Sequence, residues 1–281
     1  MMNKYVSGLY LTLIMIGLLF LAACGTADDA TADSNAEGQA EENAEKPVLR
    51  VGTEATFAPF EFLEKGEIVG FDADLLDAVL TEAGYEYEYE NVGWDPMMAS
   101  LQNKDMDFGA AAITINDDRK QTYDFSVPYF KSTHMIVFNE GAGFTSAKDL
   151  EGIKIGVQNG TTGESAAEKV VGEKNSNILK YDSTAVAFLA LKNGDVDAVV
   201  TDNVVADEYV EKNPDANVEA ITDDETFSAE YYGFMFPKGS ELVAEVDAAL
   251  TTVIENGTYA KIYKEWFGAE PNTDVLLEAA E

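Results

Sequence analysis

The sequence is poor in cysteine and histidine, with only Cys24 and His134 among its 281 residues. One cysteine cannot close an intramolecular disulfide, so a disulfide framework is excluded. There is no nucleophile motif, and a lone histidine is more often neutral, and packed or exposed, than a general base. The lack of these groups argues against an enzyme.

Basic residues are also scarce, because 18 lysines and arginines stand against 52 aspartates and glutamates, giving a formal net charge of −34. Phosphate backbones require a positive protein surface, so nucleic acid is excluded as a partner. Salt limits the attraction between exposed charges to about 8 Å, so most of the acidic charge serves solubility. Carboxylates near a pocket can nevertheless attract a cationic ligand.

The N-terminal residues have the pattern of an export signal. Lys4 precedes the apolar run Leu9–Ala23, which ends in small residues before Cys24. The end of this run resembles a bacterial lipobox, which implies that residues 1–23 are a signal peptide and that Cys24 is lipidated; a membrane-spanning anchor and a core thiol are the alternatives. Residues 24–47 are polar without periodicity, so we expect a flexible tether of about 25 Å.

One strand end is a candidate ligand site. Phe108–Ile113 reads as a buried strand, which puts Thr114 and Arg119 just past its carboxyl end. Small ligands bind at this edge of open α/β sheets, because loops there offer backbone donors that no strand uses. Arg119 is therefore a candidate to bind a ligand carboxylate; the alternative is a surface arginine paired with Asp117 or Asp118.

An internal repeat indicates two lobes. The segment Leu101–Asp107 recurs as Leu191–Asp197, and each copy leads into an apolar strand and then a polar loop. The paired aspartates lack the ligand count that calcium needs, so turn chemistry explains them better than a metal site. A hydrophobic content of 46% is enough for one large or two medium domains.

The second unit has its own candidate site. The strand Ile153–Val157 breaks into the Gly- and Thr-rich loop 158–163, which opens a helix from about Glu164 and presents free N–H groups to an anion. Asp202 follows the strand Val196–Val200, at the position that the Thr114 region takes in the first unit. Asp202 either faces a ligand or caps the next helix.

Other elements of the first unit follow from local signals. Asp72 is predicted to cap a helix that ends at Gly84. Asp95-Pro96 is predicted to begin another helix, with Trp94 just outside it in a loop. The run Tyr231–Phe236 is predicted to form one strand that returns to the first lobe.

A set of motifs then carries a family resemblance. The motifs are Gly52-Thr53-Glu54, Phe57-x-Pro59-Phe60-Glu61-Phe62, Gly70-Phe71-Asp72, Trp94-Asp95, Thr114…Arg119-Lys120, Phe125-Ser126-x-Pro128-Tyr129, Gly156-Val157-Gln158-x-Gly160-Thr161 and Asp195-x-Asp197-Ala198. Together they resemble the polar amino-acid-binding proteins of bacterial ABC importers, solute-binding protein family 3. The resemblance implies a two-lobed α/β fold of the type II periplasmic-binding-protein kind, each lobe a mixed sheet flanked by helices. Lobe 1 would span 48–138 plus 232–281 and lobe 2 139–231, joined by two hinge strands.

The resemblance also implies roles for individual residues. Arg119, with the Thr114 region and Thr161, matches the clamp for the ligand α-carboxylate, and Asp202 matches the acceptor of the α-ammonium group. Guanidinium and carboxylate suit each other because they form two parallel hydrogen bonds. Phe57 and Trp94 match the aromatic walls around the ligand side chain.

Four further positions complete the expected site and bear on specificity. Glu54 stands where relatives place an acid that reaches the far end of the ligand, which favours arginine, lysine or histidine. Gln158 stands where a glutamine binder can carry lysine, so glutamine is the second choice. Ala112 and Thr162 replace the Gly or Ser and the Gly of many relatives, so backbone contacts are expected there.

The expected partners follow from the same resemblance. They are an amino acid ligand, the permease and ATPase of an importer, and the outer face of a membrane reached through the lipid anchor, as in Gram-positive lipoproteins. We expect a monomer with no cofactor and no metal. The alternatives from other classes are a dehydratase-like enzyme and a sensor domain, although no transmembrane helix is predicted after the fold.

Overall fold

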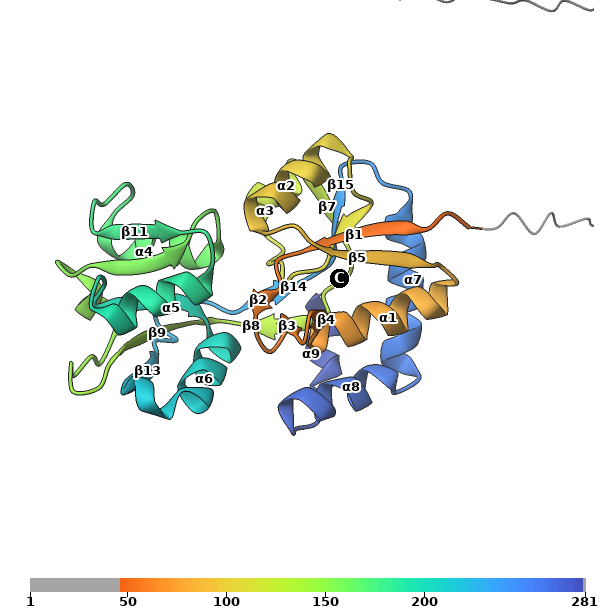
Figure 1. The fold of residues 1–281 in the computed structure, drawn as a ribbon. Coiled ribbons are helices and arrows are strands. Elements are labelled where there is room, and N and C mark those ends of the chain that lie inside the picture. The colour runs from red at the N-terminus through yellow and green to blue at the C-terminus, as the bar shows by residue number, and fades with distance from the viewer. Residues whose placement is uncertain (1–45, 280–281) are drawn as a thin grey trace, which may run out of the picture. The chain divides into compact units, whose positions relative to one another are not determined.

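The computed structural model describes residues 46–279, which form the elements shown in Figure 1. The predicted signal peptide, Cys24 and most of the predicted tether lie outside the described residues. Within residues 46–279, none of the helices has both the length and the apolar character needed to cross a bilayer.

The first sheet has the strand order β5-β1-β6-β15-β7. β1 pairs in parallel with β5 and β6, and β15 pairs antiparallel with β6 and β7. The bounds are β1 Leu49–Thr53, β5 Tyr87–Asn91, β6 Phe108–Gly109, β7 Tyr123–Phe125 and β15 Met235–Pro237. A smaller antiparallel sheet contains β2 Thr56–Phe57, β3 Glu61–Glu64 and β4 Glu67–Val69. The accompanying helices are α1 Phe71–Ala83, α2 Trp94–Asn103, α3 Asp117–Lys120, α7 Leu242–Glu255, α8 Thr258–Phe267 and α9 Thr273–Ala279.

The second sheet has the order β11-β10-β12-β9-β13 and is also mixed. β10 pairs in parallel with β11 and β12, whereas β9 runs antiparallel to β12 and β13. The strand bounds are β9 His134–Asn139, β10 Ile155–Gln158, β11 Ile178–Tyr181, β12 Ala198–Asp202 and β13 Val218–Thr222. The helices are α4 Thr162–Val171, α5 Thr184–Asn193 and α6 Asn203–Lys212, with short 3-10 turns at Ala147–Leu150 and Pro214–Ala216.

Two strands connect the two sheets, β8 Phe130–Ser132 and β14 Glu230–Tyr232, which pair antiparallel with each other (Figure 1). This confirms the expected α/β architecture of two lobes with mixed sheets and two connecting strands. We call the elements around the first sheet lobe 1 and those around the second sheet lobe 2. The predicted change of lobe after residue 138 differs from the observed pairing, because β9 belongs to the second sheet. The chain therefore enters lobe 2 before His134.

Helix α1 shows how the apolar pattern is used. Leu75, Leu76 and Val79 are fully buried, and the helix ends at Gly84 in the left-handed region, as predicted. The predicted cap at Asp72 is wrong, since the helix starts at Phe71 after Gly70. The Asp72 carboxylate instead accepts hydrogen bonds from the backbone of Ala112 and the hydroxyl of Tyr129.

Three other predicted boundaries also differ. Helix α2 begins at Trp94 rather than at Asp95-Pro96, because the left-handed Gly93 precedes it. Only Phe108–Gly109 of the predicted strand 108–113 pairs with neighbours, although residues 108–114 are all buried. The predicted strand 231–236 divides into β14 and β15 at Gly233, where a side chain would collide with Ile115.

Candidate functional site

All ten residues predicted to bind a ligand line one cavity, whose interior open to water measures about 30 Å³. They are Glu54, Phe57, Trp94, Ala112, Thr114, Arg119, Gln158, Thr161, Thr162 and Asp202. The first six come from lobe 1 and the last four from lobe 2. Six further residues complete the lining: Glu61, Ala111, Gly163, Thr184, Val200 and Thr201.

Arg119 is held in place by neutral groups. The Asn116 side chain caps the short helix α3 by accepting from the backbone N–H of Arg119 at 2.8 Å. The Arg119 guanidinium donates to the carbonyl oxygens of Thr114 at 2.9 Å and Gly160 at 3.4 Å, and it lies 5.2 Å from the centre of the Trp94 ring. The alternative pairing with a neighbouring aspartate is not observed, and no carboxylate within residues 46–279 forms an ion pair with Arg119.

This arrangement leaves the charge of Arg119 uncompensated by direct contact. Burial lowers the pKa of Arg119, and the more distant Glu230 and Asp202 oppose that shift. A guanidinium keeps its charge even so, because its ordinary pKa is far above neutrality. The cavity therefore offers a fixed cation to an incoming anion.

The loop between β10 and α4 supplies the opposing wall from lobe 2. Thr161 is the N-cap of α4, and its hydroxyl accepts from the backbone of Glu164 at 3.4 Å. The hydroxyl of Thr162, the first residue of the helix, lies 3.3 Å from that of Thr114 in lobe 1. The free N–H groups of a helix start favour an anion at this wall.

Gln158 and Glu54 connect the two lobes inside the cavity. The Gln158 amide donates to Glu54 at 2.9 Å, and its oxygen accepts from Thr184 at 3.1 Å. Glu54 is 5% exposed and also accepts from the Thr56 hydroxyl. Burial raises the pKa of Glu54, while its hydrogen bonds to Thr56 and Gln158 act in the opposite direction. Glu54 is thus a buried acid with two neutral partners.

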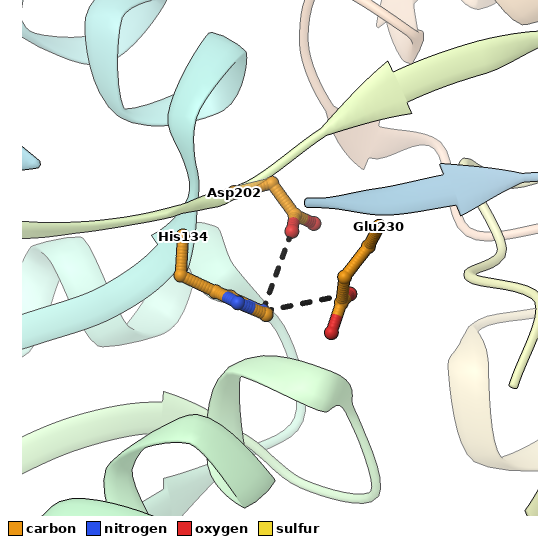
Figure 2. A group of neighbouring side chains, drawn as sticks. All are labelled: His134, Asp202 and Glu230. Atoms are coloured by element: carbon orange, nitrogen blue, oxygen red, sulfur yellow. Dashed lines mark ion pairs between the residues drawn. The ribbon is translucent and has the colours of Figure 1, made fainter. Parts of the chain in front are cut away.

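A cluster of three ionisable side chains lies at the junction of lobe 2 and the connecting strands. Figure 2 shows the carboxylates of Asp202 and Glu230 pointing toward the imidazole of His134. Nε2 of His134 lies 3.6 Å from Asp202 and 3.9 Å from Glu230. Asp202 and His134 are register partners on β12 and β9, which explains why their side chains meet.

Asp202 does not cap α6 with its side chain, although it occupies the N-cap position. Its Oδ1 is buried without a hydrogen-bond partner. Burial raises the pKa of Asp202 to about 6, an effect that His134 opposes and Glu230 reinforces. An unpartnered acceptor that lines a cavity suits a donor supplied by a ligand, such as an ammonium group.

The same three side chains could also accept a metal ion by geometry. His134, Asp202 and Glu230 each offer one ligand atom, and these atoms lie within 4.8 Å of one another. The sequence analysis expected no metal ligands. Because a ligand ammonium group and a metal cation would both be attracted to Asp202, the two could not occupy this position together.

The backbone turns sharply at Ala112, in the cavity wall. Ala112 has a φ of 46°, in the left-handed region that favours glycine, and its N–H donates to Asp72 at 2.8 Å. This turn lies between Phe108–Gly109 and Thr114, so it directs the chain into the cavity wall. The buried Asp72 anchors it.

The sequence analysis missed several groups of the site. Glu61 was named only as part of a motif, without a role, yet it lines the cavity and is 1% exposed. Its signal was an acid between Phe60 and Phe62 in a segment otherwise apolar. Glu230 and Thr184 gave no local signal, because their positions depend on the pairing of β14 with β8 and on the placement of α5.

Comparison with known sequences and structures agrees with this architecture. The sequence pattern of the bacterial extracellular solute-binding proteins, family 3, matches residues 49–269. The chain is 36% identical over 256 residues to a "Probable histidine-binding protein" of Neisseria gonorrhoeae, covering 90% of this chain and 92% of that protein. It is 32% identical over 256 residues to the "Arginine-binding extracellular protein ArtP" of Bacillus subtilis, covering 90% of this chain and 98% of the relative.

A solved structure gives the same fold. The arginine-, lysine-, histidine-binding protein ArtJ from Geobacillus stearothermophilus matches with a TM-score of 0.81 and 55% identity, over 82% of this chain and 100% of ArtJ. Its likeness identifies the two-lobed architecture as the type II periplasmic-binding-protein fold. The chain therefore belongs to family 3 of the bacterial extracellular solute-binding proteins.

Proposed function

We propose that the protein is the substrate-binding component of an ABC importer and captures a basic L-amino acid between its lobes. The observation that carries the proposal is the charge of the cavity, which combines one arginine without an ion-pair partner among the described residues with three carboxylates, Glu54, Glu61 and Asp202. A basic amino acid carries one carboxylate and two cationic groups, so it complements this arrangement. The names of the relatives, which bind arginine, lysine or histidine, support the same ligand class.

The α-carboxylate would bind Arg119. The guanidinium would form two parallel hydrogen bonds to it, and the start of α4 at Thr161 and Thr162 would contribute N–H donors. The α-ammonium group would donate to Oδ1 of Asp202, which accepts no hydrogen bond from any residue of the described chain. These two contacts are common to all α-amino acids, so they set affinity rather than side-chain preference.

The ligand side chain would be selected by the acid and aromatic groups. Phe57 and Trp94 line the cavity and offer ring faces to a guanidinium, an imidazole or an ammonium group. Glu54 would accept from the distal cation, with Gln158 holding its carboxylate in position at 2.9 Å. Burial makes these contacts stronger than they would be in water.

Binding in such a cavity would join the lobes. Side chains already reach across it, from Gln158 to Glu54 and from Thr162 to Thr114, so a ligand would add contacts to both sides. The β8 and β14 connection is the natural hinge, because within residues 46–279 the chain passes between the two large sheets through these two strands. The ligand-bound protein would then deliver its cargo to the permease and ATPase of the importer.

The remaining expectations complete the proposal. The protein would act as a monomer on the outer face of the membrane of a Gram-positive bacterium, anchored through a lipid on Cys24, without a cofactor and without catalysing a reaction. Glutamine is the second candidate ligand, since Gln158 and Thr184 are neutral hydrogen-bonding groups of the lining.

Isothermal titration tests the proposal. The purified protein is unfolded, dialysed and refolded to remove bound ligand, then titrated with each of the twenty amino acids. Tight binding of arginine, lysine or histidine, recovered unchanged afterwards, is the expected result. Tight binding of glutamine alone would retain the carboxylate clamp and reject the basic ligand, and conversion of a ligand to product would reject a pure binding function.

A further inference from the structure

Glu61 is the most deeply buried acid of the cavity and has no assigned role in the ligand site. It is the first residue of β3, lies between Phe60 and Phe62, and is 1% exposed. Its Oε2 is buried without a hydrogen-bond partner. A buried, unpartnered carboxylate would be costly in its charged form, so the empty cavity favours the protonated acid.

The groups around Glu61 reinforce that preference. Its charged neighbours are all carboxylates, namely Asp72 on α1, Glu54 after β1 and Asp202 at the end of β12. Burial raises the pKa of the Tyr89 and Tyr129 phenols, and the negative charge of Glu61 adds to this rise. Burial, followed by these three carboxylates, raises the pKa of Glu61 well above its usual range. Among the described residues, no cation contributes to holding its charge.

We infer that Glu61 reads the charge of the ligand side chain by exchanging a proton: it is protonated in the empty cavity and ionised when a cationic side chain is bound. The inference rests on the proposed function and deepens it. On binding arginine, the O–H bond of Glu61 breaks, the proton leaves to solvent, and the carboxylate accepts N–H hydrogen bonds from the guanidinium. No oxidant, reductant or further reactant is needed.

A ligand with an uncharged side chain would leave the proton in place. The uncharged side chain would then meet the neutral carboxyl group of Glu61 next to Glu54. The part of the cavity that holds the ligand side chain would therefore keep one negative charge instead of two. Selection of a cation would therefore depend on pH, since every proton released on binding makes the affinity rise tenfold per pH unit. That dependence is expected between the usual pKa of a glutamate and the raised pKa of Glu61, and it disappears above the latter.

Arginine and citrulline form a matched pair of probes, because citrulline is nearly isosteric with arginine and uncharged. Each is titrated into the refolded protein between pH 5 and pH 9, in buffers of different ionisation enthalpy, and the number of protons released is obtained from the buffer dependence of the heat. Proton changes at Asp202 and Asp72 are shared by both ligands. The difference between the number of protons released with arginine and with citrulline therefore isolates the group that responds to the charge of the ligand side chain.

The variants are Glu61→Gln and, as a control, Glu64→Gln on the same strand, whose side chain is 62% exposed. In the native protein and Glu64→Gln, arginine is expected to release about one proton more than citrulline below the raised pKa of Glu61. In Glu61→Gln that difference is expected to vanish, with a loss of arginine affinity of at least about tenfold and unchanged citrulline affinity. Unchanged citrulline binding also shows that the variant is folded.

Equal proton release with arginine and citrulline in the native protein would overturn the inference, as would persistence of the difference in Glu61→Gln. Either result leaves the proposed function intact as long as arginine binds tightly. Failure of arginine, lysine and histidine to bind the native protein would instead reject the proposed function, and with it the premise of this inference.

Discussion

Replacing Arg119 by alanine tests the carboxylate clamp. The guanidinium donates to two backbone carbonyls, of Thr114 and Gly160, and forms no ion pair with a described carboxylate, so its charge is free to meet the ligand. Without it the ligand carboxylate would be buried beside uncharged groups. Removing one partner of a buried charge pair costs about 2 to 5 kcal/mol, which corresponds to a rise in Kd of about 30-fold to several thousand-fold.

Titration calorimetry of the refolded variant with arginine measures that change. Arg50→Ala is the matched control, because Arg50 is 49% exposed and pairs with Glu90 on the surface of the first sheet. We expect the control to keep its Kd within about twofold. Arg119→Lys should lie between the native protein and Arg119→Ala, since an ammonium group keeps the charge but loses the two parallel bonds.

The unliganded protein provides an independent check. The Arg119 guanidinium donates two hydrogen bonds, whereas burial lowers its pKa, so removing it has opposing effects on stability without ligand. The melting temperature of Arg119→Ala without ligand should therefore change little, while the rise in melting temperature on adding arginine should largely disappear. An arginine affinity unchanged from the native value would refute the assignment of the clamp.

Three other substitutions test separate parts of the site. Asp202→Asn should reduce the affinities for arginine and citrulline alike. Because burial raises the pKa of Asp202 to about 6, the affinity of the native protein for citrulline should fall as the pH drops below 6. Calorimetry from pH 5 to pH 8 that finds no such decline would contradict this role of Asp202. Glu54→Gln should reduce arginine affinity more than citrulline affinity, so an equal loss for both in the same titrations would reject a distal role for Glu54. Ala112→Gly should raise the free energy of unfolding by about 1 kcal/mol, because the φ of 46° strains alanine. Urea denaturation measures this change, and a less stable variant would show that the strain is absent.

Much of the site was predictable because its residues follow strand ends. Thr114 and Arg119 come after the buried segment at 108–113, and Asp202 ends a buried strand, so one rule about sheet edges locates them. The loop 158–163 was predicted to open a helix from about Glu164; the helix is present but begins at Thr162. These local rules located Thr114, Arg119, Asp202 and the loop 158–163, whereas the other predicted cavity residues were assigned by the family resemblance.

Long-range pairing decided the rest. Glu230 comes close to His134 only because β14 pairs with β8, nearly a hundred residues away in the chain. The position of β9 in the second sheet likewise depends on β12 and β13, and its apolar sequence suits either lobe. No local pattern distinguishes these outcomes.

Capping preferences misled two predictions. Asp72 has the side chain of a good N-cap, but Gly70 begins the helix and the carboxylate holds the Ala112 turn instead. Asp95-Pro96 has the pattern of a helix start, but Gly93 allows the helix to begin at Trp94. In both cases a glycine with positive φ occupies the N-cap position instead of the predicted aspartate.

The hydrogen bond from Gln158 to Glu54 has a consequence for the protein between transport cycles. It joins lobe 1 to lobe 2 through the same carboxylate that would accept the ligand. A ligand that reaches Glu54 must therefore share this carboxylate with Gln158 or displace a bond between the lobes.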